Sequence, residues 1–571
     1  MGTHGVLAAG HYLATMAGLN ILQQGGNAID AGVAAGFCEH VLEPLQNGAG
    51  GEAPILIYSA KHGKSFAVNG HGTAPRRATI EWFREQGIDM IPGNGFLPAT
   101  VPAAFDAWIT ALREFGTMSL AQVLAPAIEL AEHGFPMYNM LREILLAKEE
   151  AFRTEWPTSA KAFLPGGRIP EVGEIYHQPL WAATFKKALR AEKDAASKGR
   201  DAGLQAARDF YYKGEIAEKI AEFVRDTEIM DGTGTPHRGL LEYDDMVGYT
   251  ALVEEPSMVN YRGIDVLKCG PWCQGPVMLQ QLTLLEGFDL KAIGHNTPDY
   301  IHTVVEAAKL AFADREAYYG DPYFDDVPMD ILLSKEYADR RRALIDPETA
   351  SPDFRPGDVG RGPLPYDPSS GKLDVPNHAH DTTHLDVIDA EGNMMSATPS
   401  GGWMQSSPVI ADLGFPLGTR CQMFFLDPRR PNALQPGKRP RTTLTPSLAM
   451  KDGKPFMALG TPGGDMQDQW TLQFFLNVVD FGMNLQEAVD APTFHTSHFP
   501  SSFNPRSMFP KRVVIEDRIP EAIREELARR GHDIVVNGPW SNGRVLGIRI
   551  QDGVIAGAAS PRLETGYAAG W

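Results

Sequence analysis

Residues 381–389 read Asp-Thr-Thr-His-Leu-Asp-Val-Ile-Asp, a run that is rich in β-branched residues and in which polar and apolar side chains largely alternate. This pattern predicts a strand over 382–389, because successive side chains of a strand point to opposite faces of its sheet. Ala390-Glu391-Gly392 predicts a turn, and residues 393–398 can return as the second strand of a hairpin. We therefore expect Thr382 to stand at the head of an antiparallel hairpin.

The segment before this hairpin has a different character. Residues 351–380 contain six prolines and four glycines, a composition that favours neither helix nor sheet. It predicts a linker or a movable tail. The pair Thr382-Thr383 then lies between a segment that could swing away and a hairpin that could hold a residue still. If the pair lay elsewhere in the chain, two threonines at the start of a strand would reflect only the β propensity of threonine.

The remainder of the chain predicts helices first and hairpins later. This order suggests helices that cover antiparallel sheets, which is an α+β fold. Helices are expected over 11–43 with a break at Gly25-Gly26, and over 211–225, 297–319, 466–481 and 520–530, with strands over 54–58, 534–536 and 544–550.

Local signals mark several of these boundaries. Asp30 is the expected cap of the second N-terminal helix, and Thr297-Pro298 is a strong start signal for the helix over 297–319. A second hairpin should turn at Asp452-Gly453 and lead into the glycine turn 460–465. A helix follows, with Asp465 as its expected cap, so this turn should present backbone N–H groups at a helix N-terminus.

Bulk properties exclude some classes of partner. The 571 residues carry a formal net charge of -19, which opposes binding to nucleic acid or to an anionic membrane surface. No basic region followed by an apolar stretch opens the sequence, and no run of about 18 apolar residues occurs. We expect a cytoplasmic protein, periplasmic only if a leader was removed, whose partner is a small molecule.

Metal and cofactor sites are not indicated. Cys38, Cys269, Cys273 and Cys421 lack the two close pairs of a structural zinc site and are too scattered for a disulfide framework. The 16 histidines show no ligand motif with carboxylates. We expect neither a metal nor a cofactor.

Short motifs in a fixed order run from about Gly5 to the C-terminus. They are Gly25-Gly26-Asn27-Ala28-Ile29-Asp30, Glu43-Pro44, residues 48–51, Thr73-Ala74-Pro75, residues 210–215, 285–290, 311–315 and 333–337, Thr382-Thr383-His384, Lys438-Arg439-Pro440 and Thr461-Pro462-Gly463-Gly464. In this order they resemble the gamma-glutamyltransferase family of N-terminal-nucleophile (Ntn) hydrolases.

The resemblance implies a four-layer αββα sandwich with additional helices. It also implies a precursor that cuts itself between Asp381 and Thr382. The products would be a large subunit, 1–381 with the proline-rich tail 351–381, and a small catalytic subunit, 382–571. The two would stay together as a heterodimer, and pairing of two such heterodimers is left open.

The resemblance also assigns roles to single residues. Thr382 would be the nucleophile, with its own α-amine as the base, since that amine has a reference pKa of about 7.7 to 8.0. Gly463 and Gly464 would hold the oxyanion through backbone N–H groups. Ser400 would steady the nucleophile, and Thr442 and Thr443 would bind the substrate carboxylate. Thr383 and His384 are interpreted as support for the strand.

The expected specificity pocket departs from the family pattern. The family's arginine position falls on His71, and its aspartate position falls on Phe424 or Phe425. Two charge-assisted contacts of about 1.5 to 3 kcal/mol each are then missing, so glutathione should bind poorly. His71 could still donate one hydrogen bond, and Arg76, Arg77 or Arg420 could supply a replacement contact.

Three hypotheses follow. The preferred one is a self-cleaving threonine amidohydrolase or acyltransferase that acts on an amide of a small carboxylic acid, as in the branch that resembles cephalosporin acylases and oxamate-type amidohydrolases. The second is a true gamma-glutamyl hydrolase or transpeptidase with a rearranged pocket. The third is an uncleaved pseudoenzyme that serves as a binding or assembly protein.

Overall fold

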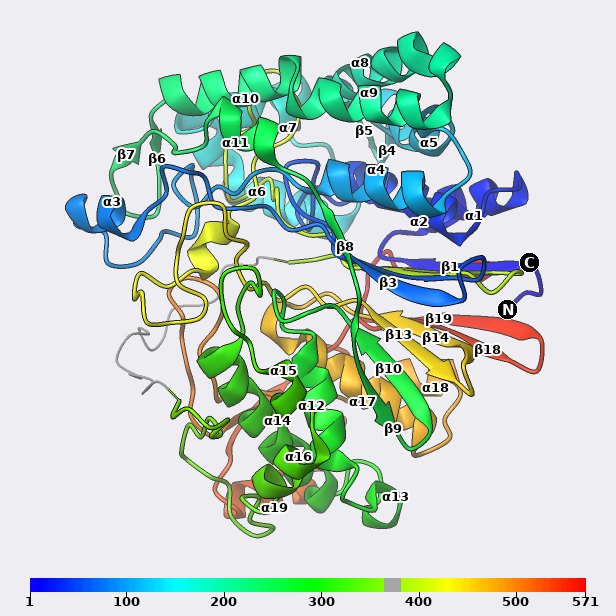
Figure 1. Ribbon diagram of the computed structural model, residues 1–571, viewed down its shortest axis with the longest axis vertical. Helices are drawn as coiled ribbons and strands as arrows, with labels where there is room; N and C mark the ends of the chain where they lie inside the picture. Colours follow the sequence, from blue (N-terminus) through cyan, green and yellow to red (C-terminus); the bar gives the residue numbers. More distant parts are fainter. Residues whose placement is uncertain (364–380) are drawn as a thin grey trace.

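Two antiparallel sheets stacked face to face form the centre of the molecule (Figure 1). The structure is a computed structural model and describes residues 1–363 and 381–571. The first sheet has the order β20-β1-β11-β12-β2-β3-β8, and the second has the order β19-β18-β14-β13-β10-β9. The strands of the first are β1 (Gly5–Ala9), β2 (Ile55–Ser59), β3 (Lys64–Asn69), β8 (Leu252–Glu254), β11 (Leu385–Asp389), β12 (Met394–Ala397) and β20 (Tyr567–Gly570). Those of the second are β9 (Ser257–Tyr261), β10 (Ile264–Lys268), β13 (Ser447–Lys451), β14 (Lys454–Gly460), β18 (Leu546–Gln551) and β19 (Val554–Ala559).

Helices cover the outer face of each sheet and complete the predicted four layers (Figure 1). The helices on the side of the first sheet are α1 (Tyr12–Gln23), α2 (Ala28–Leu42), α3 (Ile80–Glu85), α4 (Ala104–Phe115), α5 (Leu120–His133), α6 (Asn139–Thr154), α7 (Pro157–Phe163), α8 (Pro179–Ala195), α9 (Arg200–Tyr212), α10 (Glu215–Asp226) and α11 (Tyr243–Gly248). Those on the side of the second are α12 (Pro276–Leu285), α13 (Leu290–Ile293), α14 (Pro298–Tyr318), α15 (Met329–Leu332), α16 (Lys335–Arg342), α17 (Gln467–Val479), α18 (Leu485–Asp490) and α19 (Glu521–Arg529). A small sheet, β15 (Phe494–Thr496), β16 (Arg512–Glu516) and β17 (Asp533–Asn537), lies beside α14.

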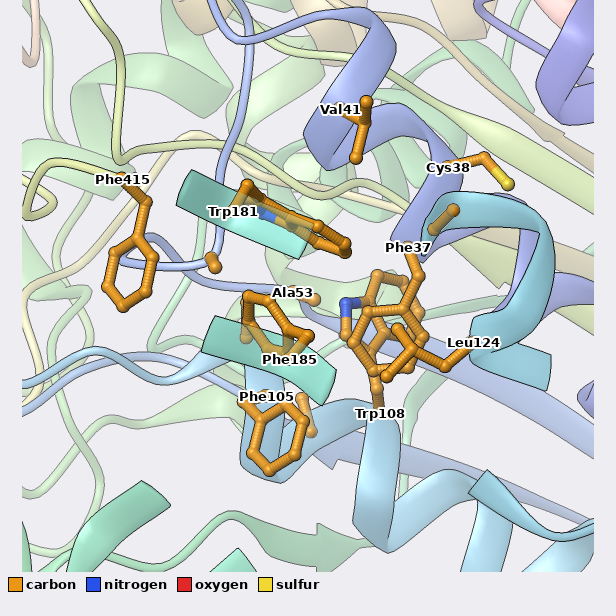
Figure 2. Close-up of a cluster of buried hydrophobic side chains, with 14 of the residues drawn as sticks. Phe37, Cys38, Val41, Ala53, Phe105, Trp108, Leu124, Trp181, Phe185 and Phe415 are labelled. Atoms are coloured by element: carbon orange, nitrogen blue, oxygen red, sulfur yellow. The ribbon is translucent and has the colours of Figure 1, made fainter. Parts of the chain in front are cut away.

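Apolar side chains fill each interface between the layers. The largest cluster lies between the first sheet and its helices, where Phe37 and Val41 of α2 point toward the aromatic rings of Trp108, Trp181 and Phe185 (Figure 2). A second cluster fills the space between the two sheets, and a third lies between the second sheet and its helices. Burial of this apolar surface is the main force that holds the layers together.

The predicted hairpin is confirmed, with a shorter first strand. β11 begins at Leu385, three residues after the predicted start, and β12 returns beside it in antiparallel register. Thr382 instead forms an isolated antiparallel bridge with Ser400. The backbone N–H of Thr383 donates to the Pro399 carbonyl over 3.2 Å, so Thr382 still stands at the head of the hairpin.

Two predicted caps are wrong. The N-cap of α2 is Asn27, and Asp30 occupies the third helical position of a capping box, where its carboxylate also accepts the backbone N–H of Thr117 over 2.8 Å. Asp465 lies inside a short 3-10 helix, η5 (Gly464–Met466), and does not cap α17. Its carboxylate binds Arg315 at 2.5 Å, because a fully buried guanidinium requires a counter-charge.

One predicted helix is two helices. The pattern over 211–225 spans the end of α9 and all but the last residue of α10, with a break at Lys213 and Gly214. Gly214 has extended backbone angles and serves as the N-cap of α10. The apolar period continues across the break, which is why the pattern alone indicated one helix.

Residues 351–363, the described part of the predicted linker, contain neither helix nor strand. Gly357 is held against α14 because its N–H donates to Asp314 Oδ1 over 2.7 Å. The remaining residues of the predicted tail, 364–380, lie outside the described residues.

Candidate active site

Thr382 lies at the end of the first sheet, with only 2% of its surface exposed. Its hydroxyl oxygen is 3.0 Å from the Ser400 hydroxyl. Their backbones pair as well, and the loop at Glu52 pairs with Ser400 from the other side. The predicted nucleophile and the hydroxyl predicted to steady it are therefore in direct contact.

The carbonyl of Asp381 is polarised by two donors. The Ser400 hydroxyl donates to it over 3.1 Å, and the Trp403 indole N–H donates over 2.6 Å. The Asp381 side chain accepts the Thr382 N–H over 2.9 Å and pairs with the Arg544 guanidinium at 2.5 Å. Negative charge that develops on this carbonyl would be stabilised by donors already in place.

Trp403 and Arg544 belong to this arrangement, and sequence reasoning missed both. The Trp403 N–H is shared between the carbonyls of Asp381 and Gln46, so it ties the peptide bond before Thr382 to the loop after α2. No local pattern could have found either residue, because a tryptophan and an arginine carry no motif outside their tertiary contacts.

Arg420 is a buried cation that is linked to the nucleophile through Ser400. Its Nη2 donates to the Ser400 hydroxyl over 2.6 Å, and its Nε binds the Glu52 carboxylate. Its guanidinium lies 4.6 Å from the centre of the Trp403 ring and 5.6 Å from that of Phe503. Burial raises the pKa of Glu52 and the Arg420 charge opposes that rise. Within residues 1–363 and 381–571, Nη1 of Arg420 has no hydrogen-bond partner.

The glycine turn adopts a conformation that requires glycine. Gly463 and Gly464 have φ of 128° and 55°, and a Cβ at Gly463 would lie 2.3 Å from the Trp470 ring. The turn follows β14 directly and is linked to Asp381 through Arg544, whose N–H donates to the Thr461 hydroxyl over 3.2 Å. Phe503, which stacks with Arg420, also lies against Gly464.

His71 and Thr442, both predicted to bind substrate, form a hydrogen bond of 2.9 Å. Burial, with the nearby Arg420 and Arg439 charges, lowers the pKa of His71 well below its usual value, so the ring is neutral. Thr443 is buried beside them, and its hydroxyl has no hydrogen-bond partner in the part of the chain that the structure describes.

The other predicted contacts lie elsewhere. Phe424 packs into an apolar cluster with Phe83 and Cys421, and its backbone carbonyl accepts from Arg506. Arg76 and Arg77 are about half exposed and pair with acidic residues near α11. Of the predicted residues, the structure thus joins Asp381, Thr382, Ser400 and Arg420, and separately joins His71 to Thr442.

A family model described as gamma-glutamyltranspeptidase matches residues 14–570, nearly the whole chain. The chain belongs to this family. The N-terminal-nucleophile hydrolase fold and the enzyme class expected from the sequence are thereby confirmed.

Curated relatives of the gamma-glutamyltranspeptidase family cover almost the whole chain. The acylase ACY 1 proenzyme of Pseudomonas sp. (strain SE83) is 33% identical over 99% of this chain and 93% of its own length. The glutathione hydrolase proenzyme of Bacillus subtilis (strain 168) is 30% identical over 98% and 90%.

Solved structures of the family agree with this fold. The protein named LmbA2991HD is 45% identical with a TM-score of 0.94, covering 100% of this chain and 98% of that one. The cephalosporin acylase from Bacillus halodurans is 33% identical with a TM-score of 0.85, covering 100% and 96%.

No helix in 1–363 or 381–571 has the length and apolar character needed to cross a membrane. No group of three or more histidine, cysteine or acidic side chains in these ranges is arranged to hold a metal ion.

Proposed function

We propose that this member of the gamma-glutamyltranspeptidase family cuts itself before Thr382 and then uses Thr382 to hydrolyse or transfer the acyl group of a small amide. The observation that carries the proposal is the contact of the Thr382 hydroxyl with Ser400, beside a scissile carbonyl that already accepts two hydrogen bonds.

In the self-cleavage step, Thr382 Oγ1 attacks the Asp381 carbonyl carbon and passes its proton on through Ser400. The C–N bond breaks, the Thr382 nitrogen leaves as an amine, and an ester joins Asp381 to the threonine oxygen. Water then opens the ester and releases the Asp381 carboxylate and the Thr382 hydroxyl. Trp403 and Ser400 stabilise the oxyanion of this step through their contacts with the Asp381 carbonyl.

In the mature enzyme, Thr382 Oγ1 attacks the substrate carbonyl while the α-amine of Thr382 takes its proton. The leaving amine departs with a proton, and an ester remains on Thr382. Water or an acceptor amine attacks this ester and regenerates the hydroxyl. Gly463 and Gly464 are the proposed oxyanion donors. Their positive φ angles form the tight glycine turn that comes just before α17.

Arg420 is proposed to select the acyl group. Its Nη2 contacts Ser400 at 2.6 Å, and Ser400 contacts Thr382 at 3.0 Å. A group bound by the unpartnered Nη1 can therefore lie only a few bonds from the attacked carbon. A short acyl chain with a carboxylate or a similar acceptor fits this arrangement, because a guanidinium binds carboxylates with directed N–H groups.

Intact mass and N-terminal sequencing of the purified protein test the proposal. A fragment beginning Thr-Thr-His-Leu-Asp supports the cut and the nucleophile. A chain that stays whole near 62.4 kDa on long incubation supports the pseudoenzyme instead. Turnover of gamma-glutamyl-p-nitroanilide at a rate equal to that of short dicarboxylic acyl-p-nitroanilides would favour the gamma-glutamyl alternative and contradict the role of Arg420.

A further inference from the structure

A pair of buried carboxyl groups lies behind the nucleophile, one on the last turn of α2 (Glu39) and one at its C-cap (Glu43). Glu39 and Glu43 are four residues apart, so they share one face of the helix, and both side chains have no exposed surface. Phe37 and Val41 point the other way, into the aromatic cluster (Figure 2). The glutamates therefore face β11, against which α2 packs.

The pair surrounds the Thr383 hydroxyl. Oε1 of Glu39 accepts the Thr383 hydroxyl over 3.3 Å and the Gly10 N–H over 3.0 Å. A Cβ on Gly10 would lie 2.2 Å from the Thr383 hydroxyl oxygen and 2.8 Å from Glu43 Oε2, so these two atoms flank one point. Position 10 is glycine because this space is already filled by the threonine and the carboxyl.

Glu43 is unusual because the hydroxyl beside its buried carboxyl, that of Thr383, already donates to Glu39. Neither of its oxygens, nor Oε2 of Glu39, has a hydrogen-bond partner within residues 1–363 and 381–571. A buried carboxylate without a partner is very costly, and its place at the C-terminal end of a helix adds to the cost. A retained proton or a counter-charge that appears later would remove this cost.

Burial and the surrounding charges indicate the protonation state of the two carboxyl groups in the precursor. Burial raises the pKa of Glu39 well above its usual value and that of Glu43 to about 7. The nearby Thr383 hydroxyl lowers the pKa of Glu43, Asp381 raises it, and Arg544 lowers it. From the α6 side, the Tyr138 hydroxyl donates to the Leu42 carbonyl, and Glu564 binds the first N–H groups of α6. The precursor pair thus keeps a proton and lacks a cation of its own.

Cleavage before Thr382 creates such a cation. In the uncut chain, the Thr382 N–H donates to the Asp381 carboxylate. Once the peptide bond is cut, this nitrogen becomes an α-amine, and Asp381 is no longer attached to it. The amine then needs another acceptor close to the backbone of residues 382–383.

We infer that Glu43 is the acceptor of the α-amino group released at Thr382, while Glu39 fixes the adjacent Thr383 hydroxyl. Glu43 is a positioning residue: it orients the amine that serves as the base and holds it against β11. The inference rests on the proposed function, because it requires the cut. It explains a buried carboxyl that the precursor leaves unsatisfied.

The inference predicts how readily the amine loses its proton. A carboxylate beside an ammonium group favours the charged form and raises the pKa of the amine. Removing the Glu43 charge by Glu43→Gln should lower the pKa of the amine by about one pH unit, so that about tenfold more of it is unprotonated at pH 7.

Periodate oxidation of the mature protein can measure this without a known substrate. Periodate breaks the Cα–Cβ bond of an N-terminal threonine, and the reaction is faster when the amine is unprotonated. The rate is followed by intact mass over a range of pH. We expect the rate for Glu43→Gln to reach half its maximum about one pH unit below the wild type, with Glu43→Asp in between. Glu43→Asp also serves if the glutamine variant does not fold.

Glu192→Gln is the matched control. Glu192 is another buried glutamate, but it accepts the first N–H groups of α5 and touches nothing at Thr382. Its variant should leave the pH profile unchanged even if it lowers stability. A Glu43→Gln profile equal to that of the cut wild type would overturn the inference alone. A wild-type chain with no fragment beginning at Thr382 would overturn the proposed function, and the inference with it.

Discussion

The hydroxyl of Thr382 lies 3.0 Å from that of Ser400, and the same Ser400 oxygen also contacts the Asp381 carbonyl and the Arg420 guanidinium. One hydroxyl thus meets the proposed nucleophile, the proposed scissile carbonyl and a buried cation. This contact determines how the site responds to substitution.

Thr382→Ala is expected to abolish self-cleavage and activity together, because no hydroxyl remains to attack. Gel electrophoresis should show one band near 62.4 kDa in place of two fragments. Thr383→Ala is the matched variant, and it should keep part of both functions. A fully cut Thr382→Ala protein would refute the nucleophile.

Ser400→Ala should slow self-cleavage by about 10 to 100-fold, since it removes one donor from the Asp381 carbonyl and the partner of the Thr382 hydroxyl. Ser400→Thr keeps the hydroxyl and should cut at a rate close to the wild type. The measurement is the fraction cut against time after synthesis. Equal rates for the alanine variant and the wild type would exclude a role for Ser400.

Gly463→Ala should reduce activity by about 100-fold or more and destabilise the fold by about 3 kcal/mol. The new Cβ meets Trp470 at 2.3 Å in a backbone conformation with φ of 128°. Gly453 is a suitable control, because it also has a positive φ of 71° but no atom lies within 4 Å of an added Cβ. Gly453→Ala should lower stability by about 1 kcal/mol and leave activity unchanged. Urea unfolding and turnover measured on both variants separate strain from catalysis.

Glu52→Ala should lower the free energy of unfolding by about 3 to 5 kcal/mol, because it leaves the buried Arg420 charge without its carboxylate. Glu174→Ala removes the partner of the exposed Arg168 and should leave the free energy of unfolding almost unchanged, because solvent screens this pair. Denaturant titration of both variants tests the contrast. A small loss in Glu52→Ala would mean that the Arg420 charge is compensated from elsewhere.

The stability of the uncut Thr382→Ala chain should depend on pH through Glu43. The pKa of Glu43 is raised from 4.5 to about 7 in the folded chain, so the folded state binds this proton more tightly than the unfolded state. The resulting stabilisation is present below pH 4.5 and is lost as the pH rises through 7, by about 3 kcal/mol. The difference in unfolding free energy between Thr382→Ala and Thr382→Ala with Glu43→Gln, measured at pH 5 and pH 8, isolates this contribution. A difference that does not change with pH would contradict the burial of Glu43.

Local signals in the sequence predicted the elements that depend on neighbours in the chain. Thr297 caps α14, and the turn at Asp452-Gly453 joins β13 to β14, both as expected. The cap at Asn27 was missed because Asn27 and Asp30 both fit the N-terminal signal, and the capping box uses both.

Tertiary pairing of the site could not be predicted in the same way. Arg420 and Glu52 are 368 residues apart, and no local signal at either position predicts an ion pair. The pair forms only in the fold, where Arg420 also donates to Ser400. Asp465 followed the cap rule in sequence, but Arg315 of α14 binds its carboxylate in the fold. Family resemblance supplied Thr382 and Ser400; the contacts of Trp403, Arg544, Glu39 and Glu43 emerge only from the fold.

The strand order of the two sheets sets what a cut before Thr382 can do to the molecule. β11, β12 and β20 come from residues after the cut and alternate with β1 and β2 from before it, and the second sheet likewise joins β10 to β13. Neither polypeptide alone contains all the strands of either sheet or a complete hydrophobic core. The break would therefore remove a covalent link without giving two independent folding units, because each polypeptide would still need the strands of the other to complete both sheets.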